Sequence, residues 1–195
     1  MRILGIDPGY AIVGAGVIEY SGQRFKTLDY GAITTPAGEQ FPIRLQMIYE
    51  QMQELLTMYK PQAMAVEKLY FNTNTTTAID VAQARGVILL TAQQAGVPCY
   101  EYTPLQVKQA VVGYGRAEKR QVIEMTKKIL SLSRTPHPDD VADALAIAIC
   151  HAHSAPNGLA GRMLEQLTHA SEGCASGRQS ADSPQLRPKH ERSSF

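Results

Sequence analysis

The sequence predicts an α/β domain in which a mixed sheet of five strands is flanked by helices. Three strand patterns come first and are joined by short polar connections, which indicates antiparallel neighbours. Helical and strand patterns then alternate along the chain, which is typical of helices packed on the faces of one sheet. A sheet that contains both the antiparallel strands and the strands joined through helices is a mixed sheet.

Each expected strand is an apolar run bounded by turn residues. The first run ends abruptly in Asp7-Pro8-Gly9, so that its last residue presents a carboxylate at a turn. The fourth run carries Glu67 in its middle. The five expected strands lie at about residues 3–6, 11–20, 25–34, 62–71 and 97–103.

Apolar residues at helical spacing predict the helices. The second helix is closed by Gly96, and the third begins at Pro104. Gly86, inside the second helix, predicts close packing on a neighbouring element. The expected helices lie at about residues 48–59, 78–95, 104–112, 122–132 and 138–148.

Composition limits the domain organisation and the cellular context. At 195 residues with 44% hydrophobic content, the chain can bury one core and a short additional segment. We expect a folded domain at 1–155 and a polar, disordered tail at 156–195, because the regular pattern dissolves from about Ser154 and large apolar residues are almost absent from Ser171 onward. The three cysteines form no CxxC pair, which indicates reduced thiols in a cytoplasmic protein. No apolar run reaches about eighteen residues, so we expect a soluble, non-secreted protein.

Four acidic residues stand in apolar surroundings: Asp7, Glu67, Asp140 and Asp143. The last two are three residues apart and therefore share one face of a helix. A buried carboxylate is costly unless it is paired or binds a metal ion. Oxygen ligands without His or Cys at metal-ligand spacing suit Mg²⁺ or Mn²⁺. Two such ions about 3.5–4 Å apart would serve in-line phosphoryl transfer.

Two other interpretations of these acids remain open. Buried ion pairs with lysine or arginine also gather carboxylates. Asp139, at the start of the same helix, is expected to cap free N–H groups and oppose the helix dipole.

Basic residues concentrate between residues 104 and 128, although the whole chain has a net charge of only +1. A local basic stretch in a near-neutral protein suits contacts with phosphates. The alternative is a solvated helix face with Glu–Lys pairs. The basic residues are Lys108, Arg116, Lys119, Arg120, Lys127 and Lys128, against Glu118 and Glu124.

Two further side-chain pairs bear on binding. Tyr70 and Phe71 are candidates for stacking on bases, but strand neighbours face opposite ways, so one of them belongs to the core. His151 and His153 suggest a metal site, but two residues that are two apart on a helix do not share a face, so we reject it.

Six short blocks of sequence follow one another within residues 1–155 and together resemble one known family. They are Gly5-Ile6-Asp7-Pro8-Gly9, Val66-Glu67, Gln83-Ala84-Arg85-Gly86, Val107-Lys108-Gln109 with Val111-Val112-Gly113, Ala117-Glu118-Lys119 and Asp140-Val141-Ala142-Asp143-Ala144-Leu145-Ala146. Each block is weak alone, and the six in this order are specific. The blocks resemble the RuvC Holliday junction resolvase family.

The resemblance implies an RNase H-like fold and a Mg²⁺-dependent homodimer that nicks two opposing strands of a four-way DNA junction. Two ions per active site are implied, with Mn²⁺ as a substitute, and so are 5′-phosphate and 3′-hydroxyl ends. The family also implies a branch-migration motor as partner and a thymine-containing cleavage sequence.

The residue roles implied by the resemblance fall on the side chains already singled out. The family's four catalytic, metal-binding acids match Asp7, Glu67, Asp140 and Asp143. Its DNA-contacting lysines match Lys108 and Lys119, and the aromatic that meets unstacked bases matches Tyr70, with Phe71 beside it. Some relatives have His at the position of Asp140 and Phe at that of Tyr70. The tail after about residue 155 has no counterpart.

Other functions are weighed against this one. The block around Asp7 also resembles the first phosphate loop of actin-like ATPases and sugar kinases, but these need a second lobe for which 195 residues leave no room. A junction-binding module without cleavage would lack one of the acids, and all are present. A related nuclease acting on another branched or RNA-containing substrate remains open, because a metal site does not define the nucleic acid.

Overall fold

The computed structural model describes residues 1–68 and 75–155 of the chain. The expected tail at 156–195 and the two aromatic candidates, Tyr70 and Phe71, lie outside the described residues. None of the described helices is long and apolar enough to cross a membrane.

The described chain forms one mixed sheet of five strands, in the order β3-β2-β1-β4-β5. β1, β2 and β3 pair antiparallel, whereas β4 and β5 extend the sheet in parallel from β1. The predicted mixed five-stranded sheet is confirmed. The strands are β1 (Arg2–Asp7), β2 (Ile12–Ser21), β3 (Arg24–Thr34), β4 (Ala63–Glu67) and β5 (Cys99–Tyr102).

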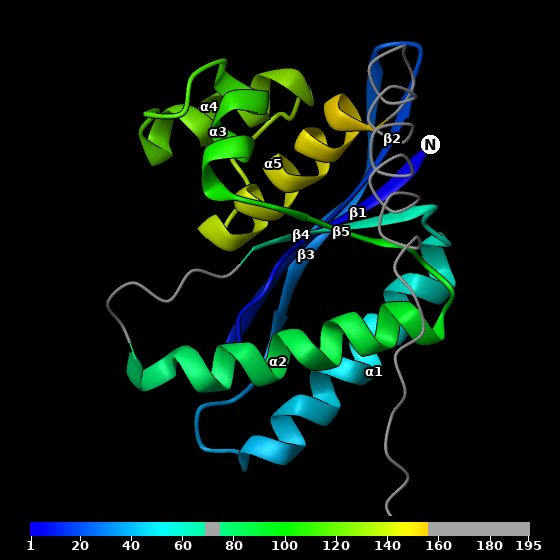
Figure 1. The fold of residues 1–195 in the computed structure, drawn as a ribbon, viewed down its shortest axis with the longest axis vertical. Coiled ribbons are helices and arrows are strands. Elements are labelled where there is room, and N and C mark those ends of the chain that lie inside the picture. The colour runs from blue at the N-terminus through cyan, green and yellow to red at the C-terminus, as the bar shows by residue number, and fades with distance from the viewer. Residues whose placement is uncertain (69–74, 156–195) are drawn as a thin grey trace, which may run out of the picture. The chain divides into compact units, whose positions relative to one another are not determined.

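Helices cover both faces of the sheet (Figure 1). One hydrophobic cluster joins alternate strand residues such as Ile3 and Ile18 to the helix α5, and a second joins Leu4 and Ile6 to helices on the other face. Neighbouring residues of β1 therefore serve opposite cores, as expected for a strand covered on both sides. On one face lie α1 (Phe41–Tyr59) and α2 (Thr75–Gln94), and on the other α3 (Pro104–Val112), α4 (Lys119–Ile129) and α5 (Asp139–Ser154).

The expected ends of the third helix are confirmed, because both are set by local chemistry. Thr103 and Gln106 form a capping box at the start of α3, with Pro104 in the first turn. Gly113 ends the helix in a left-handed conformation with φ of 92°.

Two expectations from the sequence are wrong. Glu67 is the last residue of β4 rather than its middle, because the ladder to β5 ends at the pair Glu67 and Tyr102. Gly86 is exposed and packs closely on none of the described residues, since a Cβ built there meets no described atom within 4 Å. Its neighbour Arg85 instead pairs with Glu101, which links α2 to β5.

Glycines in the centre of the sheet allow α5 to approach very closely. Gly5 of β1 and Gly16 of β2 are cross-strand partners, and Gly14 is the partner of Asp7. A Cβ on Gly5 would overlap the carbonyl oxygen of Ala144 and lie 2.8 Å from the Cβ of Ala148. A Cβ on Gly14 would overlap the carbonyl oxygen of Asp140. The start of α5 therefore rests directly on the strand beside Asp7.

Candidate active site

The four predicted acids come from two strand ends and the start of one helix. Ile6 pairs with Val66 in the parallel ladder, so that Asp7 and Glu67, one residue further along, end neighbouring strands at the same edge. The first two turns of α5 carry Asp140 and Asp143, which approach this edge over Gly14.

The electrostatics of Asp7 show that the four carboxylates act on one another. Burial, followed by the charges of Glu67, Asp143 and Asp140, raises the pKa of Asp7 from 3.8 to about 8. Burial also raises the pKa of Glu67, with Asp143 adding to the shift. The side chains that the sequence singled out are thus brought together in one partly buried region.

Lys119, the first residue of α4, forms ion pairs with two acidic residues of this region. Its Nζ atom lies 3.2 Å from Oδ2 of Asp143 and 3.3 Å from Oδ2 of Asp139. It opposes the effect of burial on the pKa values of Asp7, Glu67 and Asp143. The ion-pair interpretation is therefore realised at Asp143.

The expected capping role of Asp139 is wrong. The N-cap of α5 is Pro138, which makes no side-chain capping bond, and Asp139 follows it in the first turn. Its carboxylate forms an ion pair with Lys119 instead. Sequence reasoning missed this pair because the two residues meet only through the packing of α4 on α5.

The chemistry of these side chains fits a divalent cation. The site offers only carboxylate oxygens as anionic donors, which hard cations prefer. Burial and the charges of the neighbouring carboxylates raise the pKa of Asp7 to about 8, and a bound cation would relieve that repulsion. Within residues 1–68 and 75–155, however, no three His, Cys, Asp or Glu side chains are arranged around a single metal position. The carboxylates share one region without forming a complete coordination shell.

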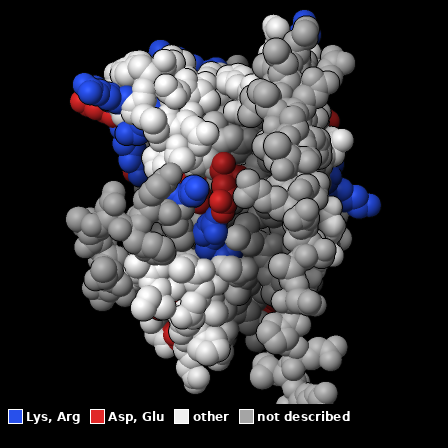
Figure 2. Space-filling model, in the orientation of Figure 1, with Lys and Arg blue, Asp and Glu red and all other residues white. Residues whose placement is uncertain are grey.

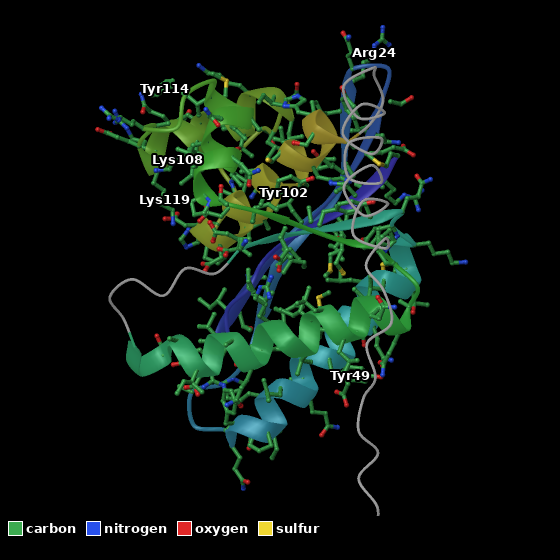
Figure 3. All side chains as sticks on the ribbon, viewed as in Figure 1. Arg24, Tyr49, Tyr102, Lys108, Tyr114 and Lys119 are labelled. Atoms are coloured by element: carbon green, nitrogen blue, oxygen red, sulfur yellow. The ribbon has the colours of Figure 1, made fainter. Side chains whose placement is uncertain are left out.

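A cavity of about 230 Å³ opens beside the acids. Its charged lining consists of Glu67, Asp143, Lys108 and Lys119. Figure 3 shows the two lysines on the same side of the molecule, Lys108 from α3 and Lys119 from the start of α4. The apolar lining residues are Pro104, Val107, Val122 and Ile147.

Two other predicted DNA-binding residues, Arg116 and Arg120, lie outside the cavity. Arg116, between α3 and α4, and Arg120, in the first turn of α4, are exposed and do not line the cavity. In the view of Figure 2, acidic and basic side chains lie next to one another near the middle of the face. Positive charge is therefore interleaved with negative charge there.

The two histidines of α5 serve different parts of the structure. His151 is buried, and burial lowers its pKa to about 4, which leaves the ring neutral at pH 7. The hydroxyl of Tyr102 lies 2.7 Å from its Nδ1 atom. His153 is exposed and lies 3.1 Å from the carbonyl oxygen of Ala110. Because Tyr102 is the ladder partner of Glu67, the bond to His151 ties α5 to the strand beside the site.

Comparison with known proteins agrees with the fold and identifies the family. The family model described as crossover junction endodeoxyribonuclease RuvC matches residues 3–151. The crossover junction endodeoxyribonuclease RuvC of Brevibacillus brevis is 62% identical over 152 residues, which cover 78% of this chain and 92% of the relative. That of Clostridioides difficile is 58% identical over 154 residues, 79% of this chain and 91% of the relative.

Solved structures show the same fold. Thermus thermophilus RuvC matches with a TM-score of 0.75 at 39% identity, over 80% of this chain and 95% of that one. The same protein in complex with a Holliday junction substrate gives a TM-score of 0.74 at 39% identity, over 78% and 93% of the two chains. The RNase H-like fold implied by the resemblance is thus confirmed. The chain belongs to the family of RuvC crossover junction endodeoxyribonucleases.

Proposed function

We propose that this protein resolves Holliday junctions with Asp7, Glu67, Asp140 and Asp143 as its catalytic acids. As a member of the RuvC family it is a metal-dependent endonuclease of DNA recombination and repair. The observation that supports the residue roles is the convergence of the four acids, because burial first, and then the charges of Glu67, Asp143 and Asp140, raise the pKa of Asp7 to about 8. A group of partly buried acids that shift one another's pKa is typical of a functional site.

The four carboxylates would hold two Mg²⁺ ions, or Mn²⁺ in their place, which when bound activate water and stabilise the leaving oxygen. A water molecule would give up a proton as its oxygen bonds to phosphorus, and the 3′ oxygen would take up a proton as its bond to phosphorus breaks. The products are a 5′-phosphate and a 3′-hydroxyl.

The remaining residues of the cavity position the DNA. Lys108 and Lys119 line the cavity beside the acids, where they would contact the scissile strand's phosphates. Release of Lys119 from Asp143 would free its charge for this contact. We assign Arg116 and Arg120 to the flanking DNA backbone, and one of the pair Tyr70 and Phe71 to stacking on unpaired bases at the crossover.

The assembly belongs to the same proposal. A homodimer would place two sites on opposing strands of a junction, because the two-fold axis of a dimer matches the symmetry of the substrate. The Thermus thermophilus relative has been solved in complex with a Holliday junction substrate. We further propose that the protein works in the cytoplasm with a branch-migration motor and prefers a thymine-containing site.

A substrate panel tests the proposal against a related nuclease activity on another nucleic acid. The intact chain with Mg²⁺ is incubated with a four-way DNA junction, a three-way junction, a linear duplex and an RNA–DNA hybrid. We expect paired nicks at symmetric positions of the four-way junction and cleavage of the others at least about tenfold slower, because only the junction engages both sites. Faster cleavage of the hybrid or the three-way junction would favour the alternative substrate.

A further inference from the structure

Arg44 of α1 is a buried cation on the face of the sheet opposite to α5. Only 7% of its surface is exposed. Among the described residues it has no carboxylate within ion-pair distance, which is unusual for a buried charge. Its charge is instead compensated by oxygen atoms and by the ring of Tyr10, which lies 4.6 Å from its guanidinium carbon.

The partners of Arg44 belong to the connection that follows Asp7. Its Nε atom donates to the hydroxyl of Thr35 at 2.8 Å, and this hydroxyl donates in turn to the carbonyl oxygen of Tyr10 at 2.7 Å. Its Nη2 atom makes a longer contact of 3.4 Å with the same carbonyl oxygen. The backbone N–H of Thr35 donates to Ala11 at 3.0 Å. Arg44 and Thr35 thereby hold two consecutive residues of the connection.

This connection has little freedom. Four residues separate Asp7 at the end of β1 from Ile12 at the start of β2. The turn is tight, because a Cβ on Gly9 would overlap the carbonyl oxygen of Ile12. An anchor at Tyr10 therefore fixes the backbone three residues beyond Asp7.

We propose that Arg44, acting through Thr35 and Tyr10, is a positioning residue that sets the orientation of the Asp7 carboxylate. The role rests on the proposed function, in which Asp7 is a catalytic acid. Arg44 acts through the backbone of the connection and touches neither DNA nor cation. The planar fork of the guanidinium suits this task, since it can engage the hydroxyl and the carbonyl together, whereas a lysine ammonium cannot reproduce that geometry.

Two variants and one matched control test the role. Arg44→Lys keeps the positive charge but removes the planar guanidinium. Thr35→Val removes the hydroxyl that links Arg44 to the carbonyl oxygen of Tyr10. Arg2→Lys is the control, because Arg2 is a partly buried guanidinium at the opposite end of β1 that donates to the carbonyl oxygen of Tyr59 in α1. For each protein we measure the thermal midpoint, junction affinity without metal, Mn²⁺ affinity without DNA by calorimetry, and the single-turnover rate of junction cleavage.

For Arg44→Lys and Thr35→Val we expect a single-turnover rate lower by about tenfold to a hundredfold, because a misplaced reacting group is costly. Mn²⁺ affinity should fall about threefold or more, while junction affinity stays within about twofold, since phosphate contacts set it. Arg2→Lys should change neither Mn²⁺ affinity nor the rate by more than about twofold, whatever its thermal midpoint.

Unchanged rate and Mn²⁺ affinity in folded Arg44→Lys and Thr35→Val proteins would overturn the role of Arg44. So would equal losses in Arg2→Lys at an equal fall in thermal midpoint, because the effect would then be one of stability alone. Failure of the proposed function looks different. In that case the unmodified chain does not cut junctions, and the Mn²⁺ affinities still decide whether Arg44 positions Asp7.

Discussion

At the scale of single residues, the site is a set of acids that repel one another. Asp7 is affected most, since burial and the charges of three other carboxylates raise its pKa to about 8. Lys119 opposes this effect and pairs with Asp143 and Asp139. The region is thus arranged for positive charge, which Lys119 supplies in part and bound cations would supply in full.

The raised pKa of Asp7 predicts how stability depends on pH without metal. Between about pH 4 and 8 the folded state keeps a proton that the unfolded state has lost, so the free energy of unfolding falls as pH rises through this window. Asp7→Asn removes this contribution. In EDTA at about pH 8, its thermal midpoint should exceed that of the unmodified protein by several degrees, and at about pH 4 the two should converge.

Thermal melts over the pH series measure this difference. Added Mg²⁺ at about pH 8 should raise the midpoint of the unmodified protein more than that of the variant, because the binding of cations to the folded state is stabilising. Parallel midpoint curves for the two proteins across the window would show that the pKa of Asp7 is not raised in the folded state.

The sequence alone singles out the acids, because the signal is a property of each residue and its immediate neighbours. An isolated carboxylate in an apolar run is costly, so Asp7 and Glu67 stand out against their neighbours. The partners of Lys119 and the buried position of Arg44 could not be predicted, because they depend on which elements pack together. Tyr70 and Phe71 remain predictions, since they lie outside the described residues.

At the scale of elements, the close approach of α5 to β1 and β2 decides where the acids meet. Gly5, Gly14 and Gly16 provide the space that the helix backbone fills. The alternation of Gly14 and Gly16 is the signal in the sequence that could have revealed this contact. With larger residues at these glycine positions, α5 would be held away from the sheet, and Asp140 and Asp143 would lie further from the strand ends.

Gly5→Ala tests this packing against Gly31→Ala as its control. The new Cβ at Gly5 would overlap the carbonyl oxygen of Ala144, whereas one at Gly31, in β3, would meet no described atom within 4 Å. We expect Gly5→Ala to lose about 1–3 kcal/mol of stability and most of its cleavage activity, because overpacking displaces α5. Denaturant unfolding and junction cleavage measure the two effects. Equal behaviour of the two variants would mean that the approach of α5 is not critical.

Element boundaries could be predicted where local chemistry sets them and not elsewhere. Thr103, Pro104 and Gly113 define α3 through capping and turn geometry. The end of β4 at Glu67 depends instead on the length of its ladder with β5. A pattern of apolar residues carries no information about that partner.

At the scale of the whole molecule, the sequence predicted the mixed sheet but left its strand order open. The order β3-β2-β1-β4-β5 makes β1 the central strand, paired antiparallel on one side and parallel on the other. Asp7 therefore ends the central strand, between β2 and β4. Strand order depends on long-range pairing, which residue patterns do not specify.

The division of the chain at residue 155 remains a prediction. Both described hydrophobic clusters consist of residues before 156, and the family model matches residues 3–151. We therefore expect a chain that stops after Ala155 to keep its thermal midpoint and to cut junctions within about twofold of the full chain, since it keeps both described clusters and the whole matched region. A large loss of either property would assign an essential role to 156–195.

The most direct test of the account compares the intact chain with Asp7→Asn on a synthetic mobile four-way junction in Mg²⁺. We expect paired symmetric nicks from the intact chain and a rate at least about a hundredfold lower for the variant, because an amide cannot supply the negative charge of the carboxylate. Junction binding should be retained by both. Cleavage unaffected by Asp7→Asn, or binding without cleavage by the intact chain, would contradict the assignment of the catalytic acids.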